Sequence, residues 1–142
     1  MTIERKGSAI WRGGFRDGSG TVSTDSGALG GYPYGYSSRF EGQTGTNPEE
    51  LIGAAHAACF TMALSLILGE AGFTADRMHT TAAVKLEKKD DGFAITASHL
   101  TLEAAIPDID AARFQELAGK AKAGCPVSKL LNANITLDAK LA

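Results

Sequence analysis

This chain of 142 residues has few cysteines, few histidines and no large excess of positive or negative charge. Each of these features excludes some classes of function. The two cysteines are too few for a disulfide scaffold or a structural zinc site. The three histidines form no metal-binding constellation, so we expect neither a metal nor a bound cofactor. The formal net charge is −2 and no basic block occurs, which argues against a nucleic-acid partner.

The N-terminal residues lead into no apolar run of the signal-peptide type, so we expect a cytoplasmic protein without a permanent disulfide. Leu51–Leu68 is the one stretch with the length of a membrane span. It contains His56, Thr61 and Ser65, and many of its other residues are only Ala or Gly. We therefore interpret it as a buried central helix and expect no membrane association.

Apolar residues make up 44% of the chain and charged residues 21%, which is typical of a globular protein. At this length we expect a single domain over residues 1–142. Loose alternation predicts strands over residues 3–12 and 15–24, and interleaved polar and aromatic residues predict a third over 36–41. The glycine-rich segment over residues 27–35 is expected to be a loop.

The clearest local signal is the start of a long helix. Asn47 suits the N-cap and Pro48 the first helical position, where no N–H is missed. Glu50 follows Asn47 by three residues, as in a capping box, and both Glu49 and Glu50 favour the positive end of the helix dipole. We expect this helix to run to about Gly69.

The second half alternates strands and helices. Strands are predicted over 78–88 and 93–105 with a hairpin turn at 90–92, helices over 110–123 and 127–131, and a last strand over 134–141. The order βββ-α-ββ-α-α-β indicates an α+β fold. One protomer of this size cannot cover an apolar helix on all sides, so we expect a dimer in which sheets sandwich paired helices.

The two cysteines lie in different surroundings. Cys59 lies in mid-helix among Ala, Phe and Met, where burial raises a thiol pKa unless a cation approaches. Cys125, between Gly124 and Pro126, is expected at the N-cap of a short helix, where free N–H groups favour an anion. These residues alone do not identify the more acidic thiol, and on cysteine count alone two buried spectator thiols are the favoured interpretation.

Other candidate residues each have a simple structural explanation. His56 precedes Cys59 by one turn and is either a donor to its sulfur or an ordinary core histidine. Arg39 is a solvated strand residue unless it serves a site, and Glu49 and Glu50 are capping acids. The three tyrosines of the glycine-rich segment either pack there or line a substrate rim; they are Tyr32, Tyr34 and Tyr36.

Together these residues resemble the OsmC/Ohr family of bacterial peroxidases. The resemblance is carried by Arg39, Asn47-Pro48-Glu49-Glu50-Leu51, Ala57-Ala58-Cys59-Phe60 and Gly124-Cys125-Pro126-Val127-Ser128. The run from Phe40-Glu41-Gly42 through Ala71-Gly72-Phe73 is similar to the OsmC branch itself. The likeness covers essentially the whole chain.

The resemblance implies an intertwined homodimer of sheets around long central helices. It implies a thiol peroxidase that reduces organic hydroperoxides, and hydrogen peroxide less well, in the response to oxidative and osmotic stress. Cys59 matches the attacking cysteine, Cys125 its resolving partner, Arg39 the arginine that holds the thiolate, and Glu49 the acid paired with that arginine, with adjacent Glu50 as a second candidate. An external dithiol, such as a lipoyl-bearing protein, would reduce the Cys59–Cys125 disulfide.

Two other functions fit parts of the pattern. A thiol–disulfide oxidoreductase would use the same cysteines on protein substrates, although its cysteines are usually close in sequence. A non-catalytic dimer that binds small apolar molecules would need neither Arg39 nor Cys59. For a peroxidase, we expect Phe40, Phe60, Met62 and the tyrosine segment to line an apolar channel.

Overall fold

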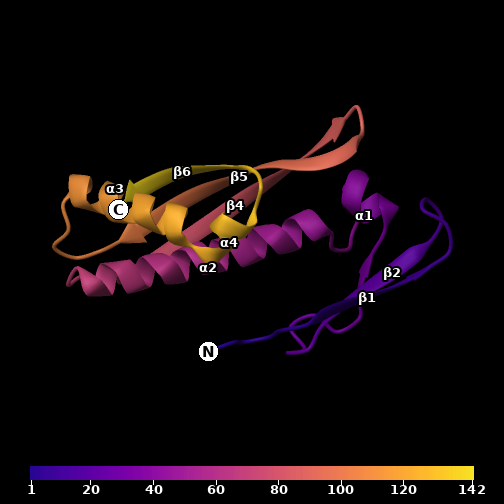
Figure 1. The fold of residues 1–142 in the computed structure, drawn as a ribbon, viewed down its shortest axis with the longest axis horizontal. Coiled ribbons are helices and arrows are strands. Elements are labelled where there is room, and N and C mark those ends of the chain that lie inside the picture. The colour runs from indigo at the N-terminus through magenta and orange to yellow at the C-terminus, as the bar shows by residue number, and fades with distance from the viewer. The chain divides into compact units, whose positions relative to one another are not determined.

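The computed structural model describes residues 1–142, which form two compact units, Met1–Leu51 and Ile52–Ala142. The first unit is an antiparallel sheet followed by a short helix (Figure 1). Strands β1 (Gly7–Arg12), β2 (Ser19–Thr24) and β3 (Tyr32–Tyr34) lie in that order. The turn after β1 uses Gly13 at a φ of 91°, which glycine adopts without the steric penalty of a side chain.

The strand predicted over residues 36–41 is wrong, because this segment forms helix α1 (Tyr36–Phe40). Tyr36 and Phe40 alternate with polar residues, but they are also i,i+4 neighbours, and their rings pack at a centroid distance of 5.0 Å on the helix. The third strand, β3, lies instead within the predicted loop. Its Pro33 is tolerated because β3 is the last strand of the sheet, and on its outer side the Pro33 carbonyl accepts a hydrogen bond from Thr46 while no Pro33 N–H is needed.

Helix α2 (Pro48–Glu70) agrees with the prediction at both ends. The Asn47 side-chain oxygen accepts a hydrogen bond from the Glu50 N–H at 2.8 Å, which confirms its role as N-cap. The Glu50 carboxylate does not complete a capping box in this arrangement. It accepts a hydrogen bond from the Thr46 hydroxyl at 3.0 Å.

The second unit contains a three-stranded mixed sheet. Strands β4 (Arg77–Lys89) and β5 (Gly92–Ala105) form the predicted hairpin, and β6 (Asn134–Leu141) pairs with β5 in parallel. Helices α3 (Ala111–Gly124) and α4 (Pro126–Leu130) connect β5 to β6 and, like α2, lie beside the sheet in Figure 1. The element order is therefore βββ-α-α-ββ-α-α-β, an α+β fold with one more helix than predicted.

The core of the second unit lies between one face of this sheet and the helices. Alternate residues of β5 are buried, as expected for a strand with one covered face. The buried apolar residues are Phe60, Leu64 and Leu68 of α2, Leu100, Leu102 and Ala104 of β5, and Phe114, Leu117, Ala118 and Ala121 of α3. Cys125 belongs to the same cluster, and the partly buried Cys59 packs against it, so both cysteines lie at this core.

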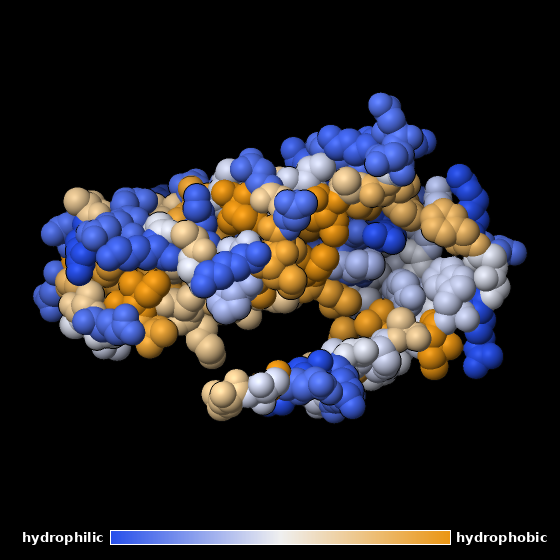
Figure 2. Space-filling view, in the orientation of Figure 1, coloured by the Kyte–Doolittle hydropathy of each residue, from blue (hydrophilic) through white to orange (hydrophobic).

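The opposite side of α2 is uncovered within one chain. The helix is long and apolar enough to cross a membrane, yet only 28% of its most apolar window is buried. Met62 and Leu66 are 77% and 65% exposed. In Figure 2 hydrophobic residues also reach the surface over the second unit. The predicted burial of this helix therefore holds for one face only.

Candidate functional site

The fold brings the two cysteines together from distant parts of the sequence. Cys59 lies in the middle of α2, next to the fully buried Phe60. Cys125 lies where α3 ends and α4 begins, and its N–H donates to the carbonyl of Ala121. Both thiols are free, and they lie within hydrogen-bonding reach of each other. The second unit thus contains a reduced dithiol pair.

The two thiols differ in access to solvent. Cys125 is completely buried, whereas Cys59 is partly exposed on α2. A small molecule arriving from solvent therefore reaches the Cys59 sulfur first. This arrangement suits an attacking thiol at Cys59 and a protected thiol at Cys125 behind it.

The surroundings of Cys125 favour its thiolate. Burial raises the pKa of the Cys125 thiol, but hydrogen bonds from the Cys59 thiol and from Ser128 and Val127 outweigh burial and lower it. The donors from the chain are the Ser128 and Val127 N–H groups at the start of α4 and the Ser128 hydroxyl. They approach the sulfur although the side chain makes no standard capping hydrogen bond.

Cys59 shows the opposite behaviour. Burial raises the pKa of the Cys59 thiol, and the hydrogen bond with Cys125 raises it further, against a lowering contact from the Val127 backbone. Within the second unit, then, Cys125 is the more acidic of the two thiols. A cation from outside this set of residues must act on Cys59 if it is to react as a thiolate.

His56 is completely buried between two serine hydroxyls. Its Nδ1 lies 2.7 Å from Ser98 Oγ on β5, and its Nε2 lies 2.8 Å from Ser128 Oγ on α4. Burial lowers the pKa of His56, so its ring is neutral near pH 7. Of the two interpretations of His56, the buried core histidine is the one the structure supports, since both ring nitrogens contact serine hydroxyls and neither contacts Cys59.

The serines of this chain had no assigned role in the sequence analysis. Ser128 stood only in the motif around Cys125, and Ser98 only in an alternating strand. Ser98 occupies an inward position of β5, and Ser128 lies three residues after the helix N-cap. The sequence could therefore have placed Ser98 on the buried face of its strand and Ser128 in the first turn of its helix. That both serines contact His56 is visible only in the tertiary structure.

Arg39 and Glu49 form an ion pair in the first unit. Arg39 lies on α1, and its Nη2 and Nε donate to the Glu49 carboxylate at 2.7 and 3.2 Å, with a further contact at 3.3 Å from Nε to the second oxygen. The Glu49 side chain is only 10% exposed, against 34% for Arg39. Glu49, and not Glu50, is therefore the partner of the arginine in this structure.

The aromatic residues of the first unit pack on one another. Tyr34 packs against Trp11, and Tyr36 against Phe15 and Phe40. These contacts favour the packing interpretation for both tyrosines. In the second unit, Phe60 is 0% exposed, so its predicted place in an apolar channel is wrong. It is a core residue because it lies on the covered face of α2.

Comparison with known proteins agrees with the fold. The family model described as "OsmC-like protein" matches residues 40–140. Peroxiredoxin OsmC of Escherichia coli is 62% identical over 141 residues, covering 99% of both chains. The organic hydroperoxide resistance protein OhrB of Bacillus subtilis is 34% identical over 124 residues, covering 87% of this chain and 89% of OhrB.

A solved structure extends the likeness to three dimensions. The crystal structure of Bacillus subtilis OhrB superposes with a TM-score of 0.68 at 31% identity, covering 96% of this chain and 98% of OhrB. The matched residues 40–140 contain both cysteines and Glu49. The chain therefore belongs to the OsmC-like family.

Proposed function

We propose that this protein is a cysteine-based peroxidase that reduces organic hydroperoxides to alcohols, with Cys59 as the attacking thiol and Cys125 as the resolving thiol. The observation that carries the proposal is the dithiol pair itself, with one sulfur accessible and the other fully buried within reach of it. Peroxidase activity agrees with the names of the relatives, Peroxiredoxin OsmC and organic hydroperoxide resistance protein OhrB.

The reaction proceeds in two steps at these sulfurs. The Cys59 thiolate attacks the terminal oxygen of ROOH, the O–O bond breaks, and the alkoxide leaves as ROH after gaining a proton. Cys59 is then a sulfenic acid, which Cys125 attacks to form the Cys59–Cys125 disulfide and water. An external dithiol, for which a lipoyl-bearing protein is our candidate, restores both thiols by exchange.

Arg39 supplies the cation that Cys59 lacks within the second unit. Its bond to Glu49 uses Nε and Nη2, which leaves Nη1 available as a donor. A guanidinium fixed in this way stabilises a thiolate and donates to peroxide oxygens in a planar fork. Glu49 acts by orienting Arg39, and its burial keeps that orientation.

A second copy of the chain covers the exposed face of α2. A groove of about 480 Å³ runs between α2 and β4, lined mainly by small or apolar residues: Ala57, Ala58, Thr61, Met62, Ser65, Met78 and Thr80. Together with Met62 and Leu66 it forms an apolar surface typical of an obligate interface, which buries on the order of 2,000 Å² or more. We propose a homodimer of a cytoplasmic protein, in which this helix is central and spans no membrane.

Peroxide consumption by the purified protein with dithiothreitol tests the function. We expect cumene hydroperoxide to be consumed faster than hydrogen peroxide. Cys59→Ser should abolish turnover, because a serine hydroxyl is not ionised near neutral pH. Cys125→Ser should consume about one equivalent and accumulate a Cys59 sulfenic acid that dimedone traps.

The same variants separate the other candidate functions. If Cys59→Ser formed a sulfenic acid on Cys125 at the rate of the unsubstituted protein, the two roles would be reversed. An oxidoreductase would reduce protein disulfides without consuming hydroperoxide. A non-catalytic binder would consume none with either peroxide.

A further inference from the structure

The second unit contains a continuous chain of hydrogen-bonding groups that ends at the buried thiol. It runs from Ser98 Oγ to His56 Nδ1, and from His56 Nε2 to Ser128 Oγ, at 2.7 and 2.8 Å. Ser128 lies three residues after Cys125, the N-cap of α4, and this N-cap–N3 relation places its hydroxyl on the side of the Cys125 sulfur. The mechanism proposed above uses Cys125 but leaves the other three residues without a task.

We propose that His56, acting through the Ser128 hydroxyl, receives the proton of Cys125 when this thiol attacks the Cys59 sulfenic acid. This inference rests on the proposed function and adds a positioning residue, His56, to its second step. The chain connects α2, β5 and α4, so it holds the resolving thiol and its proton acceptor in one arrangement.

The proton and electron balance of the step is complete. The Cys125 proton moves to Ser128 Oγ while the Ser128 hydroxyl proton moves to His56 Nε2, and His56 Nδ1–H donates to Ser98. The thiolate attacks the Cys59 sulfur, the S–S bond forms, the S–O bond breaks, and the hydroxide takes a proton from solvent at the partly exposed Cys59 and leaves as water. The imidazolium later releases one proton to solvent, so the net step converts a thiol and a sulfenic acid to a disulfide and water. The Cys59 sulfur is reduced from the sulfenic state and the Cys125 sulfur is oxidised.

The environment of His56 suits this exchange. Burial keeps its ring neutral in the resting protein, so a ring nitrogen is available to accept a proton. Once the proton has moved, the Ser128 hydroxyl donates to the thiolate, the arrangement that lowers the pKa of Cys125. The same contacts therefore connect the two residues before the transfer, as imidazole and thiol, and after it, as imidazolium and thiolate.

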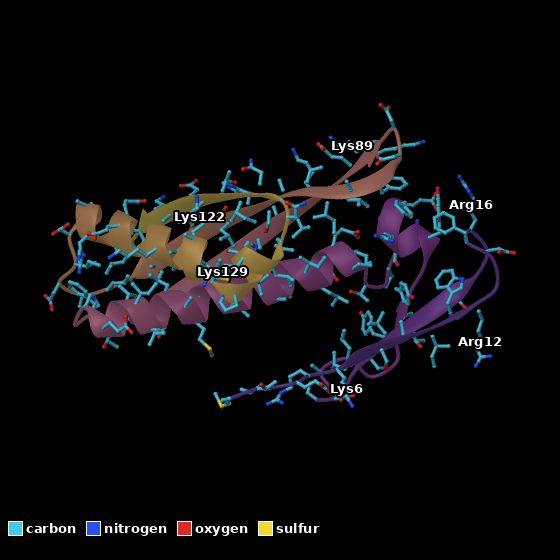
Figure 3. All side chains as sticks on the ribbon, in the orientation of Figure 1. Lys6, Arg12, Arg16, Lys89, Lys122 and Lys129 are labelled. Atoms are coloured by element: carbon cyan, nitrogen blue, oxygen red, sulfur yellow. The ribbon has the colours of Figure 1, made fainter.

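The charged and titratable groups nearest to Cys125 lie on α2, α3, α4 and β5. Cys59 on α2 is the one other titratable group that contacts the Cys125 sulfur. Lys122 on α3 and Lys129 on α4 are the charged residues next to Cys125 in sequence, and both are labelled in Figure 3. On β5, His99 and Glu103 lie on the opposite, exposed face of the sheet.

Ser128→Ala is the decisive variant because it removes only the connecting hydroxyl. The thiolate of Cys125 is titrated by its ultraviolet absorbance in a Cys59→Ser background, with no peroxide present. We expect the titration midpoint to rise by about one pH unit, and disulfide formation after one equivalent of hydroperoxide to slow about tenfold at neutral pH. Sulfenic acid formation on Cys59, measured in the same stopped-flow experiment, should keep its rate.

Two further variants separate a proton path from a structural contact. Ser128→Thr keeps the hydroxyl and should restore the pH profile of disulfide formation. His56→Gln keeps a hydrogen-bonding side chain but no proton acceptor, so it should slow this step even when the protein is folded. If either variant is too unstable to measure, nitrogen NMR of the His56 ring in the unsubstituted protein should follow the ionisation of Cys125.

A matched histidine–hydroxyl pair on the exposed sheet face provides the control. His99 Nδ1 contacts the hydroxyl of Thr136 there, and Thr136→Val should leave both steps unchanged. A pH profile unaltered in Ser128→Ala would overturn the proposal. Failure of the unsubstituted protein to form the Cys59–Cys125 disulfide would instead refute the proposed function, and the peroxide-free titration would still report on the contact with Ser128.

Discussion

Glu49 lies buried at the start of α2, where a carboxylate would be costly without a partner. The Arg39 guanidinium supplies that partner with two nitrogens, so both the charge and the oxygens of Glu49 are satisfied. The remaining nitrogen of Arg39, Nη1, makes no contact with Glu49 and can donate a hydrogen bond elsewhere. The Arg39 side chain is 34% exposed, so this nitrogen is accessible, and substitutions of Arg39 test whether the reaction uses it.

Arg39→Met should slow the first step of peroxide reduction by about a hundredfold or more, because it removes a charge-stabilising donor. Arg39→Lys should restore part of the rate, since a point charge cannot reproduce the planar fork. Glu49→Gln should cost less than Arg39→Met. Stopped-flow kinetics with cumene hydroperoxide measures each rate.

Arg16 serves as the control for this series. Its guanidinium lies over the Tyr36 ring in the same unit, 4.6 Å from the ring centroid. Arg16→Met also removes one positive charge, and we expect it to leave the rate unchanged. Equal losses in Arg16→Met and Arg39→Met would reduce the role of Arg39 to general electrostatics.

His56 makes the stability of the protein depend on pH. Burial lowers its pKa below the value of about 6.5 expected in the unfolded chain, so the unfolded state binds more protons as pH falls. The stability due to neutral His56 is therefore complete above about pH 6.5 and is lost as pH falls below it, by at most about 1.4 kcal/mol per pH unit. Urea unfolding between pH 5 and 7, which are about the limits of this window, should show a shallower dependence for His56→Gln. Equal slopes in the two proteins would contradict this.

At the scale of an element, α2 depends on a close approach to the sheet. A Cβ built on Gly53 would meet the carbonyl oxygen of Ala82 on β4 at 2.9 Å, and a backbone atom cannot move aside as a flexible side chain can. Glycine at this position therefore lets the helix and strand backbones come together. Alanine there would require the two elements to separate.

Gly53→Ala should destabilise the protein by about 1–3 kcal/mol through this overpacking. Gly119→Ala is the matched control, because a Cβ on this α3 glycine meets no atom within 4 Å. It should stabilise the protein by about 0.5–1 kcal/mol, since alanine loses less backbone entropy than glycine in a helix. Thermal or urea unfolding measures both, and a Gly53→Ala protein as stable as Gly119→Ala would refute the close approach.

At the scale of the whole molecule, the uncovered face of α2 is the feature that most needs a partner. A single chain leaves Met62 and Leu66 exposed on a helix that is otherwise apolar. A second copy that covers this face would remove those side chains from water. The other possibility, that α2 contacts lipid, is weaker because the opposite face of this helix carries two buried ionisable residues, His56 and Glu49.

Leu66→Glu should weaken the dimer by placing a charge in the proposed interface. Sedimentation at low micromolar concentration should show a dimer for the unsubstituted protein and a larger monomer fraction for Leu66→Glu. Ala83→Glu, on the exposed face of the sheet, adds the same charge and should remain dimeric. A folded, monomeric unsubstituted protein would end the proposal.

The residue pattern alone predicted most elements, because capping, turn and alternation signals act within a few neighbouring residues. Asn47, Asp110 and the turn at residues 90–92 each mark an element boundary in the sequence, and the structure confirms all three. The prediction of a strand over residues 36–41 was wrong because local signals there are ambiguous. Tyr36 and Phe40 fit alternation as well as i,i+4 spacing, and only packing of the two rings decided for a helix.

The sequence by itself determined the family and both cysteine motifs, since a motif is a property of residue order. Only the tertiary structure decided that the two thiols meet, that Cys125 is buried while Cys59 is not, and that Glu49 rather than Glu50 holds Arg39. It also decided that His56 joins Ser98 to Ser128. These contacts connect residues far apart in the chain, and such contacts depend on how helices and strands pack rather than on any local preference.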